Sequence, residues 1–206
     1  MTTLAYTGHR PNKLWGYDYK HPNYIKVKEM VKADAITALN NDPEKKITMV
    51  TGMALGFDTI VALAAIDLKQ EGYDVRLVAA IPCAGQEKQW PEPSRVMYRN
   101  ILTWCDEIIG MTETCYVELG IDYEIDFFTN TVTSYLLYKK NVQPNESHIY
   151  EQSYRPWLMQ KRNEYMVDRC DKLTALWDGS SGGTGNCVKY AIKQNKNILT
   201  IVPERI

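Results

Sequence analysis

A glycine-rich stretch, Asp178 to Tyr190, constrains the fold of this chain more than any other part of the sequence. It follows a short apolar run, Leu173 to Trp177, and it precedes a helix-like run that we expect to begin near Asn186. Glycine has no Cβ, so backbone amides in such a loop can approach a ligand closely, and the first amides of a helix attract anions. Strand, glycine loop and helix in this order favour a phosphate site, although a Gly/Ser cluster can also be a simple connection. The residues expected to hold the phosphate are Gly182, Gly183, Thr184, Gly185 and Asn186.

A similar loop follows the first predicted strand, Leu4 to Thr7. The run stops at Gly8, His9, Arg10 and Pro11, which are small, basic and turn-forming residues. Thr7 and Arg10 can donate hydrogen bonds to a phosphate or carboxylate, and His9 can donate or titrate. The alternative is a solvated turn with an exposed arginine.

A third loop follows the strand predicted over Ile47 to Val50, and an alanine-rich helix continues from it through Leu68. Glycines four residues apart at a strand-to-helix turn suit close approach of the backbone to a ligand. Asp58 either caps the helix or accepts a hydrogen bond from a ribose hydroxyl. The candidate ligand-binding residues of this loop are Gly52, Met53, Ala54 and Gly56.

The strand predicted over Val75 to Ile81 runs into a polar loop that ends at Pro91. Its residues Gln86, Glu87 and Trp90 supply an amide, a carboxylate and an aromatic ring, which could flank a base or a sugar. An ordinary surface loop is the alternative.

The remaining pattern alternates helices and strands. Further strands are predicted over Glu107 to Met111 and Ile198 to Val202, and helices over Tyr24 to Leu39, Ser94 to Cys105 with Ser94 as N-cap, Pro156 onward and Val188 to Gln194. Six strands with intervening helices predict a doubly wound, mostly parallel Rossmann-like α/β sheet with helices on both faces, in one domain over 1–206. The loops at Gly8, Gly52, Gly85 and Gly182 then lie at one sheet edge and form one crevice.

The alternation of predicted strands and helices is interrupted between Thr112 and Tyr154, where aromatic, polar and acidic residues are interleaved. We interpret about 112–154 as a partly ordered insertion for which helix and strand are both open. Its aromatic residues, among them Phe127 and Phe128, make it a candidate lid or oligomer contact, and plain surface packing is the alternative.

Composition limits the class of protein. The 206 residues carry 24 basic and 25 acidic side chains, so net charge does not indicate general binding to nucleic acid or membranes. The five cysteines are widely spaced and contain no Cys-x-x-Cys pair, which argues against disulfides and a zinc site. The beginning of the sequence resembles no signal peptide, and no apolar run reaches the roughly 20 residues of a membrane span. We expect a cytoplasmic protein without a bound metal or other cofactor.

These motifs together resemble the YpsA-like family of the SLOG superfamily, which includes the DprA single-strand binders and the LOG phosphoribohydrolases. The resemblance rests on the loops at 7–11 and 51–58, on Gln86, Glu87 and Trp90, on Arg162 and Asn163, and on the stretch 182–186. It implies a Rossmann-like fold whose glycine loops bind a nucleotide or nucleotide-derived ligand, often in a homo-oligomer.

The LOG motifs are only partly present. The LOG pattern Met-x-x-Arg-Lys matches at Met159 and Arg162, but Asn163 replaces the lysine. The glutamate that follows the LOG glycine loop is also missing, because Val188 and Lys189 occupy its place. Cleavage of an N-glycosidic bond needs a carboxylate, which here would have to come from Glu87 or Asp58 with Arg162 as the third catalytic candidate.

The sequence therefore predicts a nucleotide-binding sensor or sequestering module. A nucleotide N-glycosidase is the first alternative, and a single-strand nucleic-acid binder is the second. The second requires basic residues to converge on one surface, and the candidates are Lys161, Arg162, Lys189, Lys193 and Lys196.

Overall fold

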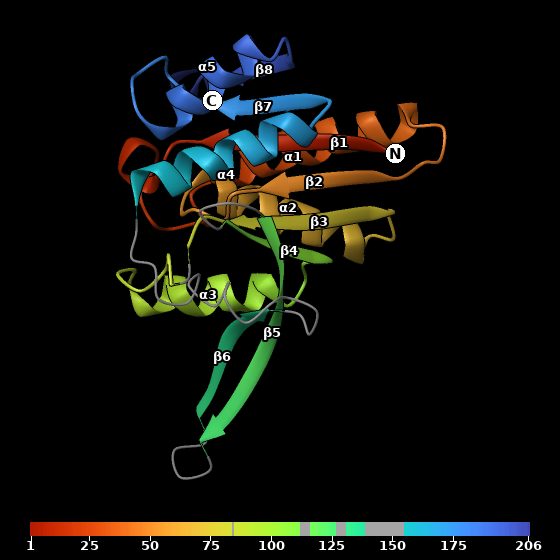
Figure 1. Ribbon diagram of the computed structural model, residues 1–206. Coiled ribbons are helices and arrows are strands. Elements are labelled where there is room, and N and C mark those ends of the chain that lie inside the picture. The colour runs from red at the N-terminus through yellow and green to blue at the C-terminus, as the bar shows by residue number, and fades with distance from the viewer. Residues whose placement is uncertain (84, 112–115, 127–130, 139–154) are drawn as a thin grey trace.

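The structure is a computed structural model that describes residues 1–83, 85–111, 116–126, 131–138 and 155–206. The chain builds an eight-stranded sheet in the order β6-β5-β4-β3-β2-β1-β7-β8 (Figure 1). The strands are β1 (Thr2–Gly8), β2 (Ile47–Thr51), β3 (Val75–Ile81), β4 (Glu107–Met111), β5 (Tyr116–Asp126), β6 (Thr131–Tyr138), β7 (Lys172–Leu176) and β8 (Asn197–Ile201). The neighbouring strands β4, β3, β2, β1, β7 and β8 all pair in parallel. β5 pairs antiparallel with β4, and β6 pairs antiparallel with β5.

Helices cover both faces of the parallel part of the sheet. They are α1 (Pro22–Asn41), α2 (Phe57–Gln70), α3 (Glu92–Leu102), α4 (Pro156–Arg169) and α5 (Gly183–Lys193), with short 3-10 turns at Pro11–Lys13 and Pro203–Arg205. One core cluster joins α1, α2 and α3 to the sheet, and a second joins α4 and α5 to its other face. All five residues of β2 are buried because both faces of this central strand are covered. The predicted doubly wound α/β fold is therefore confirmed.

The six strands predicted from the sequence correspond to β1, β2, β3, β4, β7 and β8. Four helix starts differ from the prediction, and α1 begins at Pro22, two residues before Tyr24. The N-cap of α3 is Pro91 rather than Ser94, and that of α2 is Gly56, so Asp58 is the second helical residue and not the cap. The helix α5 begins at Gly183 rather than near Asn186, because the N–H of Asn186 already donates to Gly182 O at 2.9 Å. The glycine loop thus forms the first helical turn itself.

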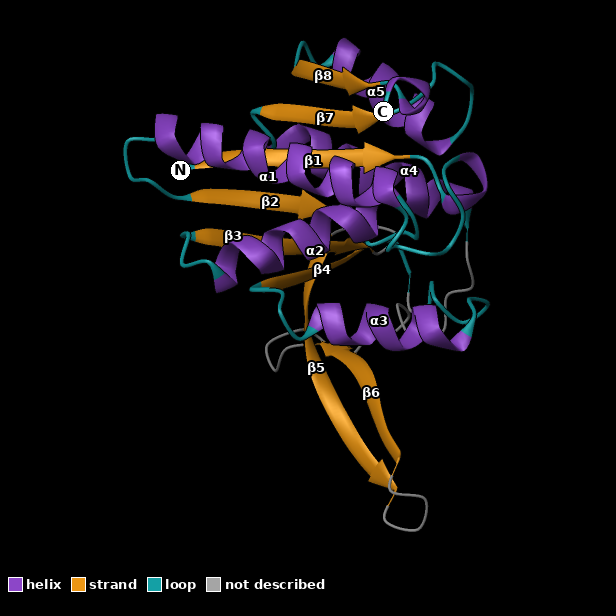
Figure 2. Cartoon of the chain, turned by 180° about the vertical axis from the view of Figure 1, so that it is seen from behind, coloured by secondary structure: helices purple, strands orange, loops and turns teal. Residues whose placement is uncertain are grey.

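The predicted insertion contains the hairpin β5–β6, which extends away from the body of the sheet (Figures 1 and 2). β5 joins the sheet through its first half, where Leu119 pairs with Ile108 and is buried. The other parts of the insertion, including Phe127 and Phe128, lie outside the described residues. Its role as a lid or oligomer contact stays a prediction.

Successive strands are added on one side of β1 and then on its other side. The chain proceeds from β1 to β2, β3 and β4 on one side, and α4 returns it to β7 and β8 on the other. The carboxyl ends of β1 and β7 lie side by side, with Gly8 opposite Leu176 and the N–H of His9 donating to Leu176 O at 3.1 Å. Ligands of doubly wound sheets bind at such a reversal point. No helix in the described part of the chain combines the length and apolar character needed to cross a membrane.

Candidate functional site

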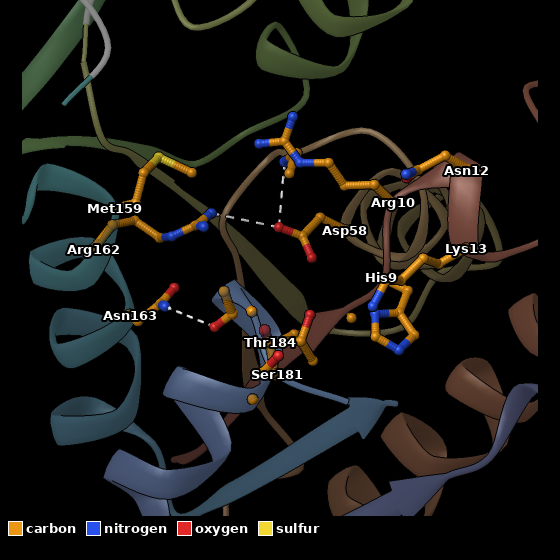
Figure 3. Close-up of a pocket in the computed structure, with 16 residues that line it drawn as sticks. His9, Arg10, Asn12, Lys13, Asp58, Met159, Arg162, Asn163, Ser181 and Thr184 are labelled. Carbon is orange, nitrogen blue, oxygen red and sulfur yellow. Dashed lines mark hydrogen bonds and ion pairs between the residues drawn. The ribbon is translucent and has the colours of Figure 1, made fainter. Parts of the chain in front are cut away.

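A cavity of about 280 Å³ opens where β1 and β7 end (Figure 3). It brings together residues from four separate segments of the chain: the loop after β1, the start of α2, the middle of α4 and the start of α5. The predicted site residues that line it are Thr7, Gly8, His9, Arg10, Ala54, Asp58, Arg162, Asn163, Gly182, Gly183, Thr184 and Gly185.

The first turn of α5 forms one wall of this cavity. Its N-cap, Gly182, has φ +138° and provides no side-chain cap, and the turn contains no acidic residue. Within the described part of the chain, the amides of Gly183, Thr184 and Gly185 have no hydrogen-bond acceptor. A Cβ added to Gly183 would meet no heavy atom within 4 Å, so the space above this turn is open. Unpaired amides at a helix N-terminus are suited to an anion.

The loop between β7 and α5 is braced from several sides. Trp177 Nε1 donates to Ser180 O, and Lys13 Nζ donates to Ser180 Oγ, each at 2.7 Å. Hydrogen bonds from the side chain and backbone of Ser180 and from His9 hold the pKa of Asp178 well below its usual range. His9 Nε2 lies 2.7 Å from Asp178 Oδ1 and ties this loop to the end of β1. These contacts hold the loop in its shape.

Arg162 forms the base of the cavity. This side chain is buried, and its Nη1 donates to Gly52 O at 2.8 Å and lies 3.5 Å from Asp58 Oδ2. Its Nε is buried and meets no hydrogen-bond partner among the residues that the structure describes. The next residue of α4, Asn163, donates from Nδ2 to Gly183 O at 3.2 Å and so connects this helix to the first turn of α5. Arg162 and the α5 amides thus face one cavity.

Asp58 is the carboxylate of the site. It is 5% exposed, and its Oδ2 accepts from Ala54 N at 3.2 Å in addition to facing Arg162. Burial raises the pKa of Asp58 above its usual value, and the charges of Arg162 and Arg10 and the Ala54 hydrogen bond oppose this shift without cancelling it. A carboxyl group beside an arginine can accept a ligand hydrogen bond or take part in proton transfer.

The glycines of the loop after β2 shape the site without lining it. A Cβ on Gly52 would lie 1.6 Å from Arg162 Nη1, so only glycine leaves room for the guanidinium. Gly56 has φ +96°, and a Cβ there would lie 2.4 Å from His9 O. Met53 is buried, and its carbonyl accepts from Gln86 Nε2 at 3.0 Å. These residues hold the cavity wall in place.

Several predicted site residues lie elsewhere. Gln86, Glu87 and Trp90 do not line the cavity. The Trp90 ring packs edge-on against Tyr98 at 5.4 Å, and Glu87 adds to the effect of burial in raising the pKa of Tyr98. Asn186 is exposed on α5 and also lies outside the cavity. The loop after β3 therefore supports the wall through Gln86 but contributes no lining residue among those predicted.

Four lining residues were not among the predicted site residues: Asn12, Lys13, Met159 and Ser181. Signals for two of them were present in the sequence. Met159 precedes Arg162 by three residues and so lies on the same helix face, and Ser181 belongs to the Gly/Ser cluster. Lys13 belongs to the short 3-10 turn after Pro11, whose direction the sequence did not indicate.

The basic residues considered for nucleic-acid binding do not all lie on one surface. Arg162 is buried in the cavity, whereas Lys193 lies in the last turn of α5. Lys196 Nζ donates to the carbonyls of Asp168 and Cys170 at the opposite end of α4. Among the described residues, no group of three or more His, Cys, Asp or Glu side chains could hold a metal ion.

Comparisons with known proteins agree with this architecture. The family model YpsA, described as the YspA SLOG family, matches residues 4–154. The SPbeta prophage-derived protein YoqJ of Bacillus subtilis is 29% identical over 174 residues, which cover 84% of this chain and 85% of YoqJ. The UPF0398 protein YpsA of the same organism is 24% identical, over 89% of this chain and 80% of its own length. The crystal structure of DNA processing protein A from Streptococcus pneumoniae aligns with a TM-score of 0.50 and 14% identity, over 97% of this chain and 50% of that one.

Proposed function

Because the chain belongs to the YpsA family of SLOG proteins, we propose that it binds the phosphate of a nucleotide or nucleotide-derived ligand at the first turn of α5. The observation that carries this proposal is the set of amides at Gly183, Thr184 and Gly185, which meet no acceptor among the described residues and belong to residues that line the cavity. The protein would act as a sensor or a sequestering module for that ligand.

The charges around the cavity support an anionic ligand. Three cationic side chains line it, Arg10, Lys13 and Arg162, against the single carboxylate Asp58, while His9 is engaged with Asp178. Arg162 adds a buried guanidinium to the lining of the cavity. An anion at the first turn of α5 would accept from its amides and lie in the same cavity as this positive charge.

Isothermal titration calorimetry and thermal shift against nucleoside monophosphates, dinucleotides and cyclic ADP-ribose-type nucleotides test this proposal. We expect at least one phosphorylated compound to bind, and Gly183→Asp to abolish its binding, because a carboxylate then occupies the anion position. Asn186→Asp is the matched control, since it adds the same charge to the same helix turn outside the cavity and should weaken binding far less. Failure of every phosphorylated compound to bind would refute the proposal.

A second candidate function is hydrolysis of the N-glycosidic bond of a nucleotide, which the position of Asp58 favours. Asp58 lines the cavity beside Arg162, whereas Glu87 does not line it, so Asp58 is the better placed of the two predicted carboxylates. Val188 is buried and Lys189 is exposed, and neither replaces the missing LOG glutamate. The test is release of free base from nucleoside monophosphates, which we expect Asp58→Asn to reduce by about 100-fold. If the Asp58→Asn and Arg162→Ala variants still release free base at the original rate, these two residues are not catalytic.

Single-strand nucleic-acid binding is a third, lower-ranked proposal, because Arg162 is buried and so is not on one exposed surface with the lysines named for it. A mobility shift at two salt concentrations decides it. Phosphate-backbone binding should weaken strongly as salt rises, so absence of a shift at low salt excludes this function.

A further inference from the structure

Asp58 presents a free hydrogen-bond acceptor to the cavity. Its Oδ2 already accepts from Ala54 N at 3.2 Å and faces Arg162 Nη1 at 3.5 Å. Its Oδ1 has no hydrogen-bond donor within the part of the chain that the structure describes. Figure 3 shows this second oxygen on the side of the carboxyl group that is turned toward Thr184 and Ser181. A carboxylate oxygen in so buried a position needs a donor, and the cavity leaves this place to a ligand.

The ligand group that meets Asp58 must therefore differ from the group that meets α5. A phosphate carries only acceptors at neutral pH and would be repelled by the carboxylate, so Asp58 selects a hydroxyl or an amine instead. The two subsites share one cavity of about 280 Å³, connected along its wall by Asn163 and Arg162. That volume, near the lower limit of about 300 Å³ for ligand pockets, suits one phosphorylated sugar with its base better than a dinucleotide.

We infer that Asp58 is a specificity-determining residue that accepts a hydrogen bond from a ribose hydroxyl, so that the site prefers ribonucleoside monophosphates to their deoxy forms. This inference rests on the proposed function, because it assumes that the phosphate lies at the first turn of α5. In a nucleoside monophosphate the 2′- and 3′-hydroxyls lie within a few bonds of the phosphate, which matches two subsites in one small cavity. The base then extends toward the open side of the cavity, and the inference assigns it no contact.

Calorimetry at pH 8, which favours the ionised form of the Asp58 carboxyl more than neutral pH does, tests the inference on the unaltered protein. The probes are AMP, 2′-deoxy-AMP, 3′-deoxy-AMP, IMP and inorganic phosphate. We expect AMP and IMP to bind similarly, and at least one deoxy form to bind about 10-fold or more weakly, because a hydrogen bond to a charged group is lost. Equal binding of AMP and both deoxy forms, or a loss confined to IMP, would overturn the inference.

Asp58→Asn provides the second arm of the test. The asparagine carbonyl should take the place of Oδ2, since Ala54 N and Arg162 both donate, and its amide group would then face the ligand. We expect this variant to discriminate less between AMP and its deoxy forms while retaining phosphate binding, because a neutral amide makes a weaker hydrogen bond to the hydroxyl than the charged carboxylate does. Undiminished discrimination in Asp58→Asn would contradict the role of Asp58, and the comparison on the unaltered protein decides the question if the variant does not fold.

The two proposals fail differently. If neither nucleotides nor inorganic phosphate bind, the phosphate site at α5 is wrong and the ribose subsite fails with it. If ribonucleotides and deoxyribonucleotides bind equally well and Gly183→Asp abolishes both, the phosphate site stands and only the assignment of Asp58 is refuted.

Discussion

The contact between Gly52 and Arg162 shows how one missing side chain shapes the site. The guanidinium lies against the backbone of Gly52 and donates to its carbonyl, and this position brings it beside Asp58. A buried arginine of this kind is stable because a carbonyl and a carboxylate meet it. The absence of a Cβ at Gly52 is therefore as important for the cavity as the charge of Arg162.

Gly52→Ala should displace the guanidinium, because the new Cβ would lie 1.6 Å from Nη1. We expect a loss of about 3 kcal/mol in the free energy of unfolding, since Asp58 would keep a buried charge without its partner. Urea denaturation measures this loss. Gly183→Ala is the control, because its Cβ would meet no atom within 4 Å, and its stability should match that of the unaltered protein. Equal stability of Gly52→Ala and the unaltered protein would contradict this account.

The start of α2 depends on a contact with the loop after β1. The N–H of Phe57 donates to His9 O at 3.2 Å, and the N-cap Gly56 passes close to the same carbonyl. Gly56 N donates to Tyr19 Oη at 2.9 Å, which adds a third segment to this junction. The helix that presents Asp58 is thus fixed relative to the loop that presents Arg10.

Gly56→Ala and Gly72→Ala form a matched pair that separates backbone strain from this contact. Both glycines have positive φ, +96° and +88°, but a Cβ meets His9 O at 2.4 Å only at Gly56 and meets nothing within 4 Å at Gly72. We expect Gly72→Ala to lower the free energy of unfolding by about 1 kcal/mol because of its strained φ. Gly56→Ala should lower it by a further ~1–3 kcal/mol because of the clash. Thermal or urea unfolding measures both. Equal losses would show that the His9 contact adds no constraint.

The parallel sheet and the hairpin β5–β6 are structurally separable. The first half of β5 pairs with β4 as far as the buried Leu119, whereas from Leu119 to Asp126 the strand pairs with β6. The cavity lies instead where β1 and β7 end. The hairpin beyond Asp122 and Tyr135 is therefore expected to be unnecessary for the fold and for the ligand site.

Replacement of residues 123–134 by an Asn-Gly turn tests this separation, because Asp122 and Tyr135 are paired in register and a two-residue turn can join them. We expect cooperative unfolding with an unchanged midpoint and unchanged nucleotide affinity. Loss of the cooperative transition would show that the hairpin is part of the folding unit. Sedimentation of both proteins also tests the predicted homo-oligomer, and dissociation on truncation would make the hairpin its contact.

The sequence was sufficient for features that depend on neighbouring residues. Apolar runs ended by glycine loops predicted the strands β1, β2, β3, β4, β7 and β8, and the glycine cluster that includes Gly182 and Gly183 indicated a loop that does line the cavity, whereas the anion site there stays a prediction. The hairpin was not predicted, because interleaved polar and aromatic residues fit a strand and a helix equally well. The start of α5 was placed three residues late, because glycine has low helix propensity and does not mark the first helical turn.

The tertiary structure decided which loops share the cavity. Pairing of β1 with β7 brings the loop after Thr7 to the turn of Gly183, although more than 160 residues separate them in the sequence. Packing of the helices also decided two contacts: Trp90 lies against Tyr98 of α3, and Arg162 of α4 lies against Asp58 of α2. These contacts join residues far apart in the chain, and their geometry follows from strand order and helix packing, which local sequence signals do not specify.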